Sequence, residues 1–523
     1  MPAAIVLIGF MAAGKSAAAR AVAERLGSEP LDADRLLEAE LGEPIAAFFE
    51  REGEAEFRRR EQALVLGLLE RAHAAAAGAP PVIALGGGAV ESERIREALA
   101  AELCVWCQVD LEVAWERSQR NRARPLAADR DAFVARFEAR EPLYQGLARA
   151  ILPSGARDAA GPATPWLAAM TALPGLRMVW AESAGGAYPA AIGAGALALL
   201  DRARAHDPAV APQRLFCVGD RAALGDHAGM LPGCEAVIEV AGGEESKTIA
   251  EAERVLSELA GAGARREDGV LAFGGGVVGD LGGFCAATYQ RGIPVVQAPT
   301  TLVAMVDSAY GGKTGVDLPA AKNYVGAYHQ PLAVLADPGT LATLPREELA
   351  AGFVEAVKTA LIAGGGLWDR VRSLQALDGP ELDTVIFDCA WTKIEVVASD
   401  ERDSGRRAVL NLGHTVGHAI ETAAGYGRLR HGEAVGLGLL AALRLSGAEQ
   451  LRGEVATLLE AHGLPTAIEA GVEADEVLAA VARDKKATGE GVGFVLLEGP
   501  GKPSWGQRVD PDRVRAAVEE LYR

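Results

Sequence analysis

The first 26 residues constrain the fold more than any other part of the chain. The apolar run Ala4–Gly9 is typical of a buried strand, and it leads directly into Gly9-Phe-Met-Ala-Ala-Gly14-Lys15-Ser16, which matches GxxxxGK[ST]. A helical pattern over Lys15–Leu26 follows at once. A strand, a glycine-rich turn and a helix in this order begin a parallel βαβ unit. The sequence therefore predicts an α/β fold with a parallel sheet.

The rest of the chain divides by its pattern of apolar runs. Further strands are expected at Pro81–Leu85 and Leu103–Val109, and a Pro/Gly/Ala-rich stretch follows around 153–175. Strand and helix patterns alternate again to about residue 340, and the remainder is mostly helical. We expect an N-terminal parallel-sheet domain (1–160), a linker (161–176), a Rossmann-like α/β domain (177–340) and a mostly helical domain (341–523).

Composition excludes several classes of protein. The 523 residues are 50% hydrophobic and 24% charged, so the chain is not a disordered one. The net charge of −19 argues against binding to nucleic acid or to an anionic membrane. Neither a secretory signal pattern nor an apolar run of about 18 residues is present, so we expect a cytoplasmic protein. Cys104 and Cys107 form a CxxC inside an apolar run, which favours a buried strand over a zinc site.

The Gly9–Ser16 loop has the chemistry of a phosphate site. Gly9 and Gly14 let backbone amides approach phosphate oxygens at a helix N-terminus. Lys15 would reach the β- and γ-phosphates, and Ser16 would hold Mg²⁺. The alternative is a plain glycine-rich turn with an exposed lysine. Asp32 and Asp34 follow the first helix, where one carboxylate could support magnesium and the other could orient a hydroxyl group, or both could lie on a solvated turn.

Residues 1–150 resemble the shikimate kinases. The resemblance rests on the phosphate loop, the Asp-x-Asp pair, GExxFRxxE from Gly53, the triple glycine Gly86-Gly87-Gly88, Arg124-Pro-Leu and Arg140-Glu-Pro-Leu-Tyr144. It implies a P-loop kinase fold in which the substrate is held by Asp34, Arg58, Gly86, Gly87, Gly88 and Arg140. It also implies that Asp32 serves the metal, that Arg124 closes over the phosphates and that Arg117 lies near the adenine. Ala12 stands where the family usually has glycine, which is tolerable unless that residue needs a positive φ.

A second glycine loop lies in the middle of the chain. The strand pattern around Leu271 ends in Gly274-Gly275-Gly276, and a helix pattern containing Asp280 follows. This order suits a pyrophosphate at a helix N-terminus, although the loop does not follow GxGxxG and could be a tight turn. Thr300 and Thr301 end another expected strand and offer hydroxyl groups there.

Three of the eight histidines fall within 18 residues, and this cluster predicts a metal site. His414 and His418 are spaced i, i+4 on one helical face, and His431 follows. Glu355 lies in another helical pattern, three residues before Lys358. Two imidazoles and a carboxylate form a catalytic zinc shell with an open position. Spacing alone would make both His414 and His418 ligands, and ordinary surface or core histidines are the alternative.

Residues 177–523 resemble 3-dehydroquinate synthases. The stretches GGGVVGDLGGF, RGIPVVQAPTTLVAMVDS, GGKTGV, AKNYVGAYHQP, GFVEAVK, AVLNLGHTVGHAIE, HGEAVGLG and DKK carry the resemblance. It implies that zinc, or Co²⁺ by ligand chemistry, binds Glu355, His414 and His431, and that His418 contacts substrate or transfers a proton. The implied NAD-binding residues are Glu244, Lys247, Gly275, Gly276, Asp280, Thr300, Thr301, Lys322 and Thr343. The implied substrate-site residues are Asp307, Lys313, Asn323, Lys358, Lys393, Arg407, Asn411 and Lys485, with Arg291 reaching the site of a neighbouring subunit in a homodimer.

Together the two resemblances imply one chain with two activities in aromatic-precursor biosynthesis. The first would be ATP-dependent phosphorylation of the shikimate 3-hydroxyl, with Lys15, Asp34 and Arg124 as catalytic residues. The second would be NAD- and metal-dependent conversion of 3-deoxy-D-arabino-heptulosonate 7-phosphate to 3-dehydroquinate and phosphate, with Lys313, Lys358, Lys393 and His418 as catalytic residues. Two alternatives remain: a cyclase that forms an inosose-type ring, and an N-terminal part that is a non-catalytic scaffold.

Overall fold

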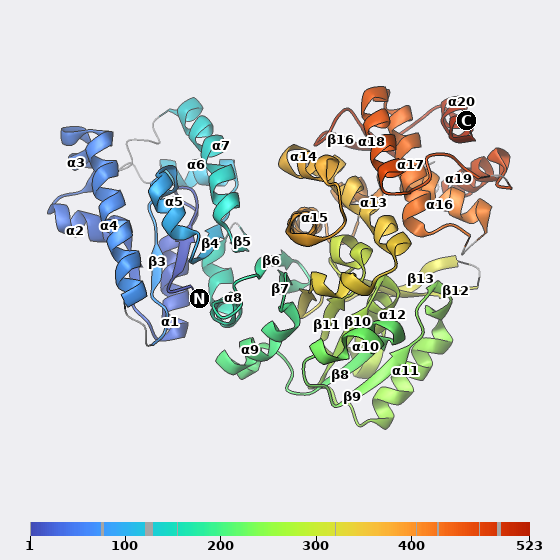
Figure 1. Cartoon of the computed structure of the whole chain (residues 1–523), viewed down its shortest axis with the longest axis horizontal. Coiled ribbons are helices and arrows are strands. Elements are labelled where there is room, and N and C mark those ends of the chain that lie inside the picture. Colours follow the sequence, from blue (N-terminus) through green and yellow to red (C-terminus); the bar gives the residue numbers. More distant parts are fainter. Residues whose placement is uncertain are drawn as a thin grey trace. The chain divides into compact units, whose positions relative to one another are not determined.

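The computed structural model describes the chain at residues 2–74, 78–120, 129–153, 155–319, 321–403, 405–425, 428–469, 471–488 and 493–522 (Figure 1). Of residues 156, 157, 321 and 484–488 it describes the backbone alone. The chain packs into two compact units. The first comprises Met1–Glu182 and Tyr188–Gln213, and the second comprises Ser183–Ala187 and Arg214–Arg523.

The first unit is a parallel sheet covered by helices. Its elements are β1 (Ile5–Ile8), α1 (Lys15–Leu26), β2 (Pro30–Asp32), α2 (Ala33–Leu41), α3 (Ile45–Glu52), α4 (Glu54–Ala74), β3 (Val82–Ala84), the 3-10 helix η1 (Ala89–Glu91), α5 (Glu93–Leu99), β4 (Leu103–Cys107), α6 (Leu111–Gln119), α7 (Arg130–Leu147), β5 (Ala150–Leu152), α8 (Ala156–Met170), β6 (Arg177–Ser183), β7 (Gly186–Ile192) and α9 (Leu199–His206). The strands lie in the order β2-β3-β1-β4-β5-β6-β7. The pairs from β2 to β6 are parallel.

Burial explains why the sequences of these strands are continuous apolar runs. Every residue of β1 and β4 is buried, as expected for parallel strands covered on both faces. The predicted helix over Lys15–Leu26 is confirmed, with αL glycines at both ends. Cys104 and Cys107 lie in β4 with no exposed surface, and burial raises the pKa of each thiol to about 12. The interpretation of this CxxC as strand core is confirmed.

The prediction of a linker at residues 161–176 was wrong for most of its length. Residues Ala156–Met170 form α8, which packs against α1 and buries Ala163, Trp166 and Leu167. Pro162 and Pro165 lie inside this helix, so tertiary packing outweighs the hydrogen bonds that they remove. The first unit also continues beyond the expected boundary, because β6 extends the sheet by pairing with β5.

The second unit begins with another parallel sheet. Its elements are β8 (Leu215–Asp220), α10 (Arg221–His227), β9 (Ala236–Val240), η6 (Glu244–Ser246), α11 (Ile249–Gly261), β10 (Gly269–Gly274), α12 (Gly276–Thr288), η7 (Tyr289–Arg291), β11 (Val295–Pro299), the π-helix η8 (Ala304–Ser308), β12 (Lys313–Leu318), β13 (Ala321–Tyr328), β14 (Ala333–Ala336) and η9 (Pro338–Thr343). The strand order is β14-β11-β10-β8-β9, and these pairs are parallel. β12 and β13 form a separate antiparallel hairpin that packs on α12.

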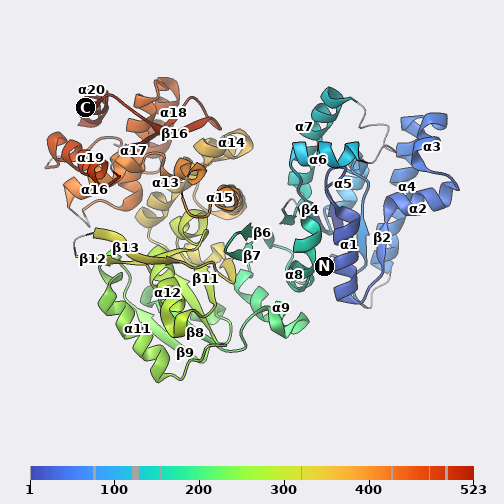
Figure 2. The ribbon, with the colours of Figure 1, turned by 180° about the vertical axis from the view of Figure 1, so that it is seen from behind.

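The remainder of the second unit is mostly helical. It contains α13 (Arg346–Ala363), α14 (Gly365–Ser373), α15 (Gly379–Ser399), η10 (Arg406–Asn411), α16 (His414–Ala424), α17 (His431–Leu445), α18 (Glu449–Ala461), α19 (Ala474–Thr488), β15 (Phe494–Leu497), β16 (Pro503–Gln507) and α20 (Pro511–Glu519). Seen from behind, these helices form one layer, the sheet with α11 and α12 forms another, and the hairpin lies between them (Figure 2). The predicted fold class of two α/β parts and a helical part is confirmed.

Among the helices of the described residues, none combines the length and the apolar character that crossing a membrane requires.

Candidate functional sites

The loop between β1 and α1 has the backbone of a phosphate site. Gly9, Ala12 and Gly14 all have positive φ, at 142°, 63° and 91°. Gly14 is the N-cap of α1 and makes no side-chain cap, so the first amides of the helix face outward from its end. The Lys15 ammonium donates hydrogen bonds of 2.9 Å to the carbonyls of Gly9 and Phe10, which holds this charge over the loop.

Four other residues are predicted to bind the nucleotide or the magnesium ion, and the structure describes three of them. Arg117 donates a hydrogen bond of 3.3 Å to the Ala12 carbonyl, so it lies at the loop. Ser16 is the second residue of α1. Asp32 is the N-cap of α2 and accepts a hydrogen bond from the Arg35 amide at 3.2 Å. Arg124 lies outside the described residues.

The triple glycine closes tightly over acidic groups. A Cβ added at Gly86 would lie 2.6 Å from Glu61 Oε1 and 2.7 Å from Asp34 Oδ1. A Cβ at Gly88 would overlap the guanidinium of Arg58. The glycines therefore let backbone lie directly against the side chains of α2 and α4. Burial raises the pKa of Glu61 despite the opposing charge of Arg58.

Two arginines predicted to hold the substrate, Arg58 and Arg140, meet at one residue, Glu91. Arg58 lies 2.7 Å from Glu61 and 3.2 Å from Glu91, and Arg140 lies 3.0 Å from Glu91. The Arg140 side chain is buried, whereas that of Glu91 is half-exposed. Tyr144 fixes the same region by donating a hydrogen bond of 2.5 Å to the Gly87 carbonyl.

The second glycine loop also ends a buried strand and starts a helix. Gly275 is the N-cap of α12 and has no side-chain cap. A Cβ at Gly275 would lie 3.0 Å from Thr301 Cγ2, and one at Gly276 would lie 3.0 Å from Ser308 Oγ. The Thr300 amide donates to the Gly274 carbonyl at 2.9 Å, which brings the carboxyl ends of β10 and β11 together. Such an edge with a free helix N-terminus can receive a pyrophosphate.

Lys247 joins the residues predicted for the nucleotide to those predicted for the substrate. Its buried ammonium lies 2.5 Å from Asp280 Oδ2 and 2.5 Å from Asn323 Oδ1. Lys322, on the hairpin, lies 3.7 Å from Glu244 and 3.4 Å from Glu421. Thr343 hydrogen-bonds to the His227 ring at 2.7 Å.

Two helices of the second unit present cations to Asp307. The Lys393 ammonium of α15 lies 2.8 Å from Asp307 Oδ1, and that of Lys358 in α13 lies 3.7 Å away. Both lysines are buried. Burial opposes ionisation of Asp307, but the two ammonium groups lower the pKa of this carboxyl. The cluster therefore holds two buried ammonium groups at one carboxylate, and a bound anion could also contact them.

Two more predicted substrate residues are already held by the protein. The buried guanidinium of Arg407 donates to the carbonyls of Gly311 and Glu401, the latter at 2.5 Å. Lys313 lies 2.6 Å from Asp403. Asn411 and Arg291 are exposed, at the ends of η10 and η7. The Lys485 side chain lies outside what the structure describes.

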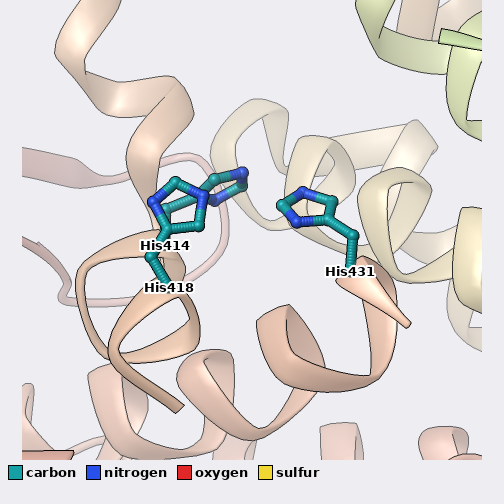
Figure 3. A group of neighbouring side chains, drawn as sticks. All are labelled: His414, His418 and His431. Atoms are coloured by element: carbon teal, nitrogen blue, oxygen red, sulfur yellow. The ribbon is translucent and has the colours of Figure 1, made fainter. Parts of the chain in front are cut away.

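Imidazoles from two helices meet beside a buried carboxylate. Figure 3 shows His414 and His418 projecting from α16 toward His431 of α17. One ring nitrogen from each histidine lies within 4.8 Å of the others. Glu355 Oε1 on α13 lies 3.4 Å from His431 Nε2 and 3.6 Å from His414 Nε2. Glu355 thus pairs with the two histidines that the synthase resemblance singles out.

The charges at this centre suit a divalent cation. Burial opposes ionisation of Glu355, but Lys358, His414 and His431 hold its pKa well below the usual range. Burial lowers the pKa of His414 to about 3, so this ring is neutral and able to donate a lone pair. Both carboxylate oxygens of Glu355 are buried without a hydrogen bond of acceptable geometry, although Lys358 Nζ lies 2.5 Å from Oε2. A metal ion would satisfy these oxygens, so the donor set fits one.

Close backbone packing positions the centre. Gly432, directly after His431, lies against the Ala351 carbonyl of α13, and an added Cβ would overlap that oxygen. Because Glu355 is one turn further along α13, this contact sets the separation between Glu355 and His431.

The sequence comparisons agree with this division of the chain. Residues 11–170 match the model of the shikimate kinase family, and residues 237–351 and 352–487 match the N-terminal and C-terminal models of 3-dehydroquinate synthase. The 3-dehydroquinate synthase of Symbiobacterium thermophilum is 43% identical over 358 residues, which cover 64% of this chain and 98% of that protein. That of Halorhodospira halophila is 44% identical, covering 62% of this chain and 94% of that protein. The chain belongs to the 3-dehydroquinate synthase family.

The shikimate kinase match precedes the synthase matches on one chain, so the predicted fusion is confirmed. Both activities, kinase and synthase, belong to the shikimate pathway. A solved structure of 2-deoxy-scyllo-inosose synthase in complex with carbaglucose-6-phosphate, NAD⁺ and Co²⁺ is 25% identical, with a TM-score of 0.57, and covers 66% of this chain and 99% of that chain. Identity to the dehydroquinate synthases is far higher, which favours their product over an inosose-type ring.

Sequence reasoning assigned no role to three acidic residues that the structure places at these sites. Glu61 belongs to the GExxFRxxE motif of the kinase part and pairs with Arg58. Glu421 ends the stretch AVLNLGHTVGHAIE of the synthase part and contacts His431. Glu91 pairs with both arginines that are predicted to bind substrate, and nothing in its sequence neighbourhood beyond the triple glycine indicated it.

Proposed function

We propose that the first unit binds ATP with Mg²⁺ at the Gly9–Ser16 loop. The outward amides of α1 and the ammonium of Lys15 support binding of the phosphates there. Ser16 and Asp32 would hold the magnesium ion, which neutralises phosphate charge when bound. Arg117 would lie beside the nucleotide, and Arg124 would close over the transferring group.

The side chains beside the triple glycine bind shikimate in this proposal. Asp34 faces the Gly86–Gly88 loop and would orient the hydroxyl group that is phosphorylated, and accept its proton. Arg58 and Arg140 would hold the substrate carboxylate, because both guanidinium groups already converge on one carboxylate in this structure.

The second unit uses NAD and a metal ion as its cofactors in this proposal, because similar synthases have been solved with NAD⁺ and Co²⁺ or Zn²⁺ bound. The free N-terminus of α12 with Gly275 and Gly276 would take the pyrophosphate. Glu244, Lys247, Asp280, Thr300, Thr301, Lys322 and Thr343 would complete the nucleotide site. Glu355, His414 and His431 would hold Zn²⁺ or Co²⁺. When bound, NAD⁺ supplies reversible hydride transfer and the metal ion supplies Lewis acidity at the reacting alcohol.

The chain's own residues bind and orient the heptulosonate phosphate. The cations Lys313, Lys358, Lys393, Arg407 and Lys485 would bind its phosphate and carboxylate, with Asp307, Asn323 and Asn411 contacting hydroxyl groups. His418 lies in the imidazole group beside the proposed ligands, where it would move a proton. Exposed Arg291 would reach the site of a second copy in a homodimer.

The six cysteines are free, which supports a reducing, cytoplasmic location.

The pairing of Glu355 with His414 and His431 carries the synthase assignment. Glu355→Gln should remove bound metal and reduce dehydroquinate formation at least about a hundredfold, because a ligand and its charge are lost. Glu348→Gln is the matched control: Glu348 is on the same helix but pairs with Arg430. Normal metal content in Glu355→Gln would contradict the assignment.

Asp34 tests the kinase assignment in the same way. Asp34→Asn should lower the rate of shikimate phosphorylation at least about a hundredfold, because the group that accepts the hydroxyl proton is removed. An unchanged rate at saturating shikimate and ATP would contradict the role of Asp34.

A further inference from the structure

The first unit contains a carboxylate of its own at the two arginines proposed to bind substrate. Glu91 ends η1, three residues after the last glycine of the Gly86–Gly88 loop. Its Oε1 lies 3.0 Å from Arg140 Nε, and its Oε2 lies 3.2 Å from Arg58 Nη2. The two oxygens of one carboxylate therefore contact two different guanidinium groups, as the carboxylate of a small ligand would.

The exposure of the three side chains would allow the carboxylate of a ligand to replace that of Glu91. The Arg140 side chain is 4% exposed and that of Arg58 is 24% exposed, so their charges need an anion. The Glu91 side chain is 41% exposed. Glu91 is therefore the most exposed of the three side chains and the one that can turn further into solvent. Arg58 keeps a second partner in Glu61, at 2.7 Å.

We propose that Glu91 is an affinity- and specificity-determining residue that occupies the place of the substrate carboxylate. This inference rests on the proposed roles of Arg58 and Arg140. Substrate must displace Glu91, so the apparent affinity for shikimate is lowered by the fraction of molecules in which Glu91 is in place. A displaced Glu91 also leaves a negative charge near the bound carboxylate, which weakens binding further.

The same contact discriminates between ligands. A cyclic polyol that carries a carboxylate replaces the charge of Glu91 at both arginines. A neutral polyol cannot, because displacing Glu91 would leave the buried Arg140 without a counter-charge. Glu91 thus favours carboxylated substrates by making neutral ones more costly to bind.

The test compares Glu91→Gln with the wild-type chain in steady-state kinetics at saturating ATP. Gln keeps the length of the side chain and an oxygen acceptor but removes the charge. The KM for shikimate should fall about two- to fivefold, the range expected for a partly exposed ion pair, with kcat unchanged. Glu54→Gln is the matched control, because Glu54 also pairs with Arg58, at 3.4 Å, but lies further into solvent. Its KM should change less than that of Glu91→Gln.

The opposite result has a clear meaning. If Glu91 instead holds the arginines in place for substrate, the KM of Glu91→Gln rises, and that outcome or an unchanged KM overturns the proposal. Glu91→Thr should behave like Glu91→Gln. Loss of the thermal transition of the first unit in both variants also contradicts the proposal, since a competing group is dispensable for folding.

Two ligand experiments complete the test. The methyl ester of shikimate keeps the ring hydroxyls and lacks the charge. Because the ester must also displace Glu91, its dissociation constant should fall in Glu91→Gln as that of shikimate does. An ester that binds Glu91→Gln no more tightly than wild type would overturn the proposal. Arg140→Met tests the proposed carboxylate site separately from the competition by Glu91. If Arg140→Met binds shikimate as tightly as wild type, the proposed carboxylate site is wrong. If Arg140→Met binds shikimate more weakly but Glu91→Gln does not bind it more tightly, only the competition is refuted.

Discussion

Glu421 Oε2 lies 3.2 Å from His431 Nδ1. The other ring nitrogen of His431 faces Glu355 at 3.4 Å. Burial opposes ionisation of Glu421, but His431 and Lys322 lower its pKa to about 2. Burial opposes protonation of His431, but Glu355 and Glu421 raise its pKa to about 10. A metal ion would therefore displace the proton on Nε2, while the charged carboxylate of Glu421 keeps the proton on Nδ1. Glu421 therefore positions His431 for the proposed metal centre.

Glu421→Gln should weaken metal binding by about 10- to 100-fold, because an amide orients the ring less strongly and adds no charge. The measurement is the dissociation constant of Zn²⁺ or Co²⁺ by chelator competition, which needs no turnover. Glu433→Gln serves as the control, since Glu433 lies two residues from His431 but pairs with Arg430. Equal metal affinity in wild type and Glu421→Gln would show that the contact is only structural.

Gly432→Ala should disturb the same centre through packing. A methyl group there overlaps the Ala351 carbonyl, so α17 must shift away from α13 and carry His431 with it. We expect the free energy of unfolding to fall by about 1–3 kcal/mol, together with weaker metal binding. Denaturant titration and metal titration measure the two effects.

Gly436→Ala is a matched change on the same helix. The nearest atom to a Cβ at Gly436 is 3.4 Å away, on Leu459, so the methyl fits. Alanine should stabilise this helix by up to about 1 kcal/mol. Equal effects of the two alanines would refute the role of the close contact at Gly432.

Ala12→Gly should stabilise the first unit. Ala12 has φ of 63°, a conformation that costs an alanine about 1–2 kcal/mol, whereas glycine loses about 0.5–1 kcal/mol of backbone entropy. A net gain of up to about 1 kcal/mol and an unchanged or tighter binding of ATP are therefore expected. Thermal unfolding and ATP titration measure these. Ala13→Gly, at a buried position without positive φ, should instead destabilise. A lower melting temperature of Ala12→Gly than of wild type would contradict this account of the loop.

Removing the transition metal should separate the two activities. Dialysis against dipicolinate, followed by assay in excess Mg²⁺, should abolish dehydroquinate formation and leave shikimate phosphorylation unchanged, because the two proposed metal sites have different donors. Zn²⁺ or Co²⁺ should restore the lost activity. An equal loss of both activities would contradict separate metal sites.

Local patterns of the sequence predict much of this fold. The Lys15–Leu26 helix, the buried Cys104–Cys107 strand and the glycine loops are all set by residues adjacent in sequence. The linker prediction failed because Pro162 and Pro165 suggested an irregular chain, whereas packing of α8 on α1 decides its conformation. Such a contact between distant segments leaves little trace in a local pattern.

The candidate sites could also be predicted only in part from local sequence patterns. Spacing alone favoured His414 and His418 as a ligand pair, while resemblance favoured His414 and His431. The structure gathers all three rings but brings Glu355 to the latter pair. Glu421 and Glu91 act through contacts with residues on other elements, so neither could be recognised from its neighbours in sequence.

The two catalytic sites proposed for this chain should act independently of each other. The most direct measurement is to assay shikimate phosphorylation and dehydroquinate formation on the same purified preparations of wild type, Lys15→Met and His431→Ala. We predict that wild type has both activities, that Lys15→Met loses only the phosphorylation and that His431→Ala loses only the dehydroquinate formation together with its metal. A wild-type chain lacking either activity, or one variant abolishing both, would contradict the account.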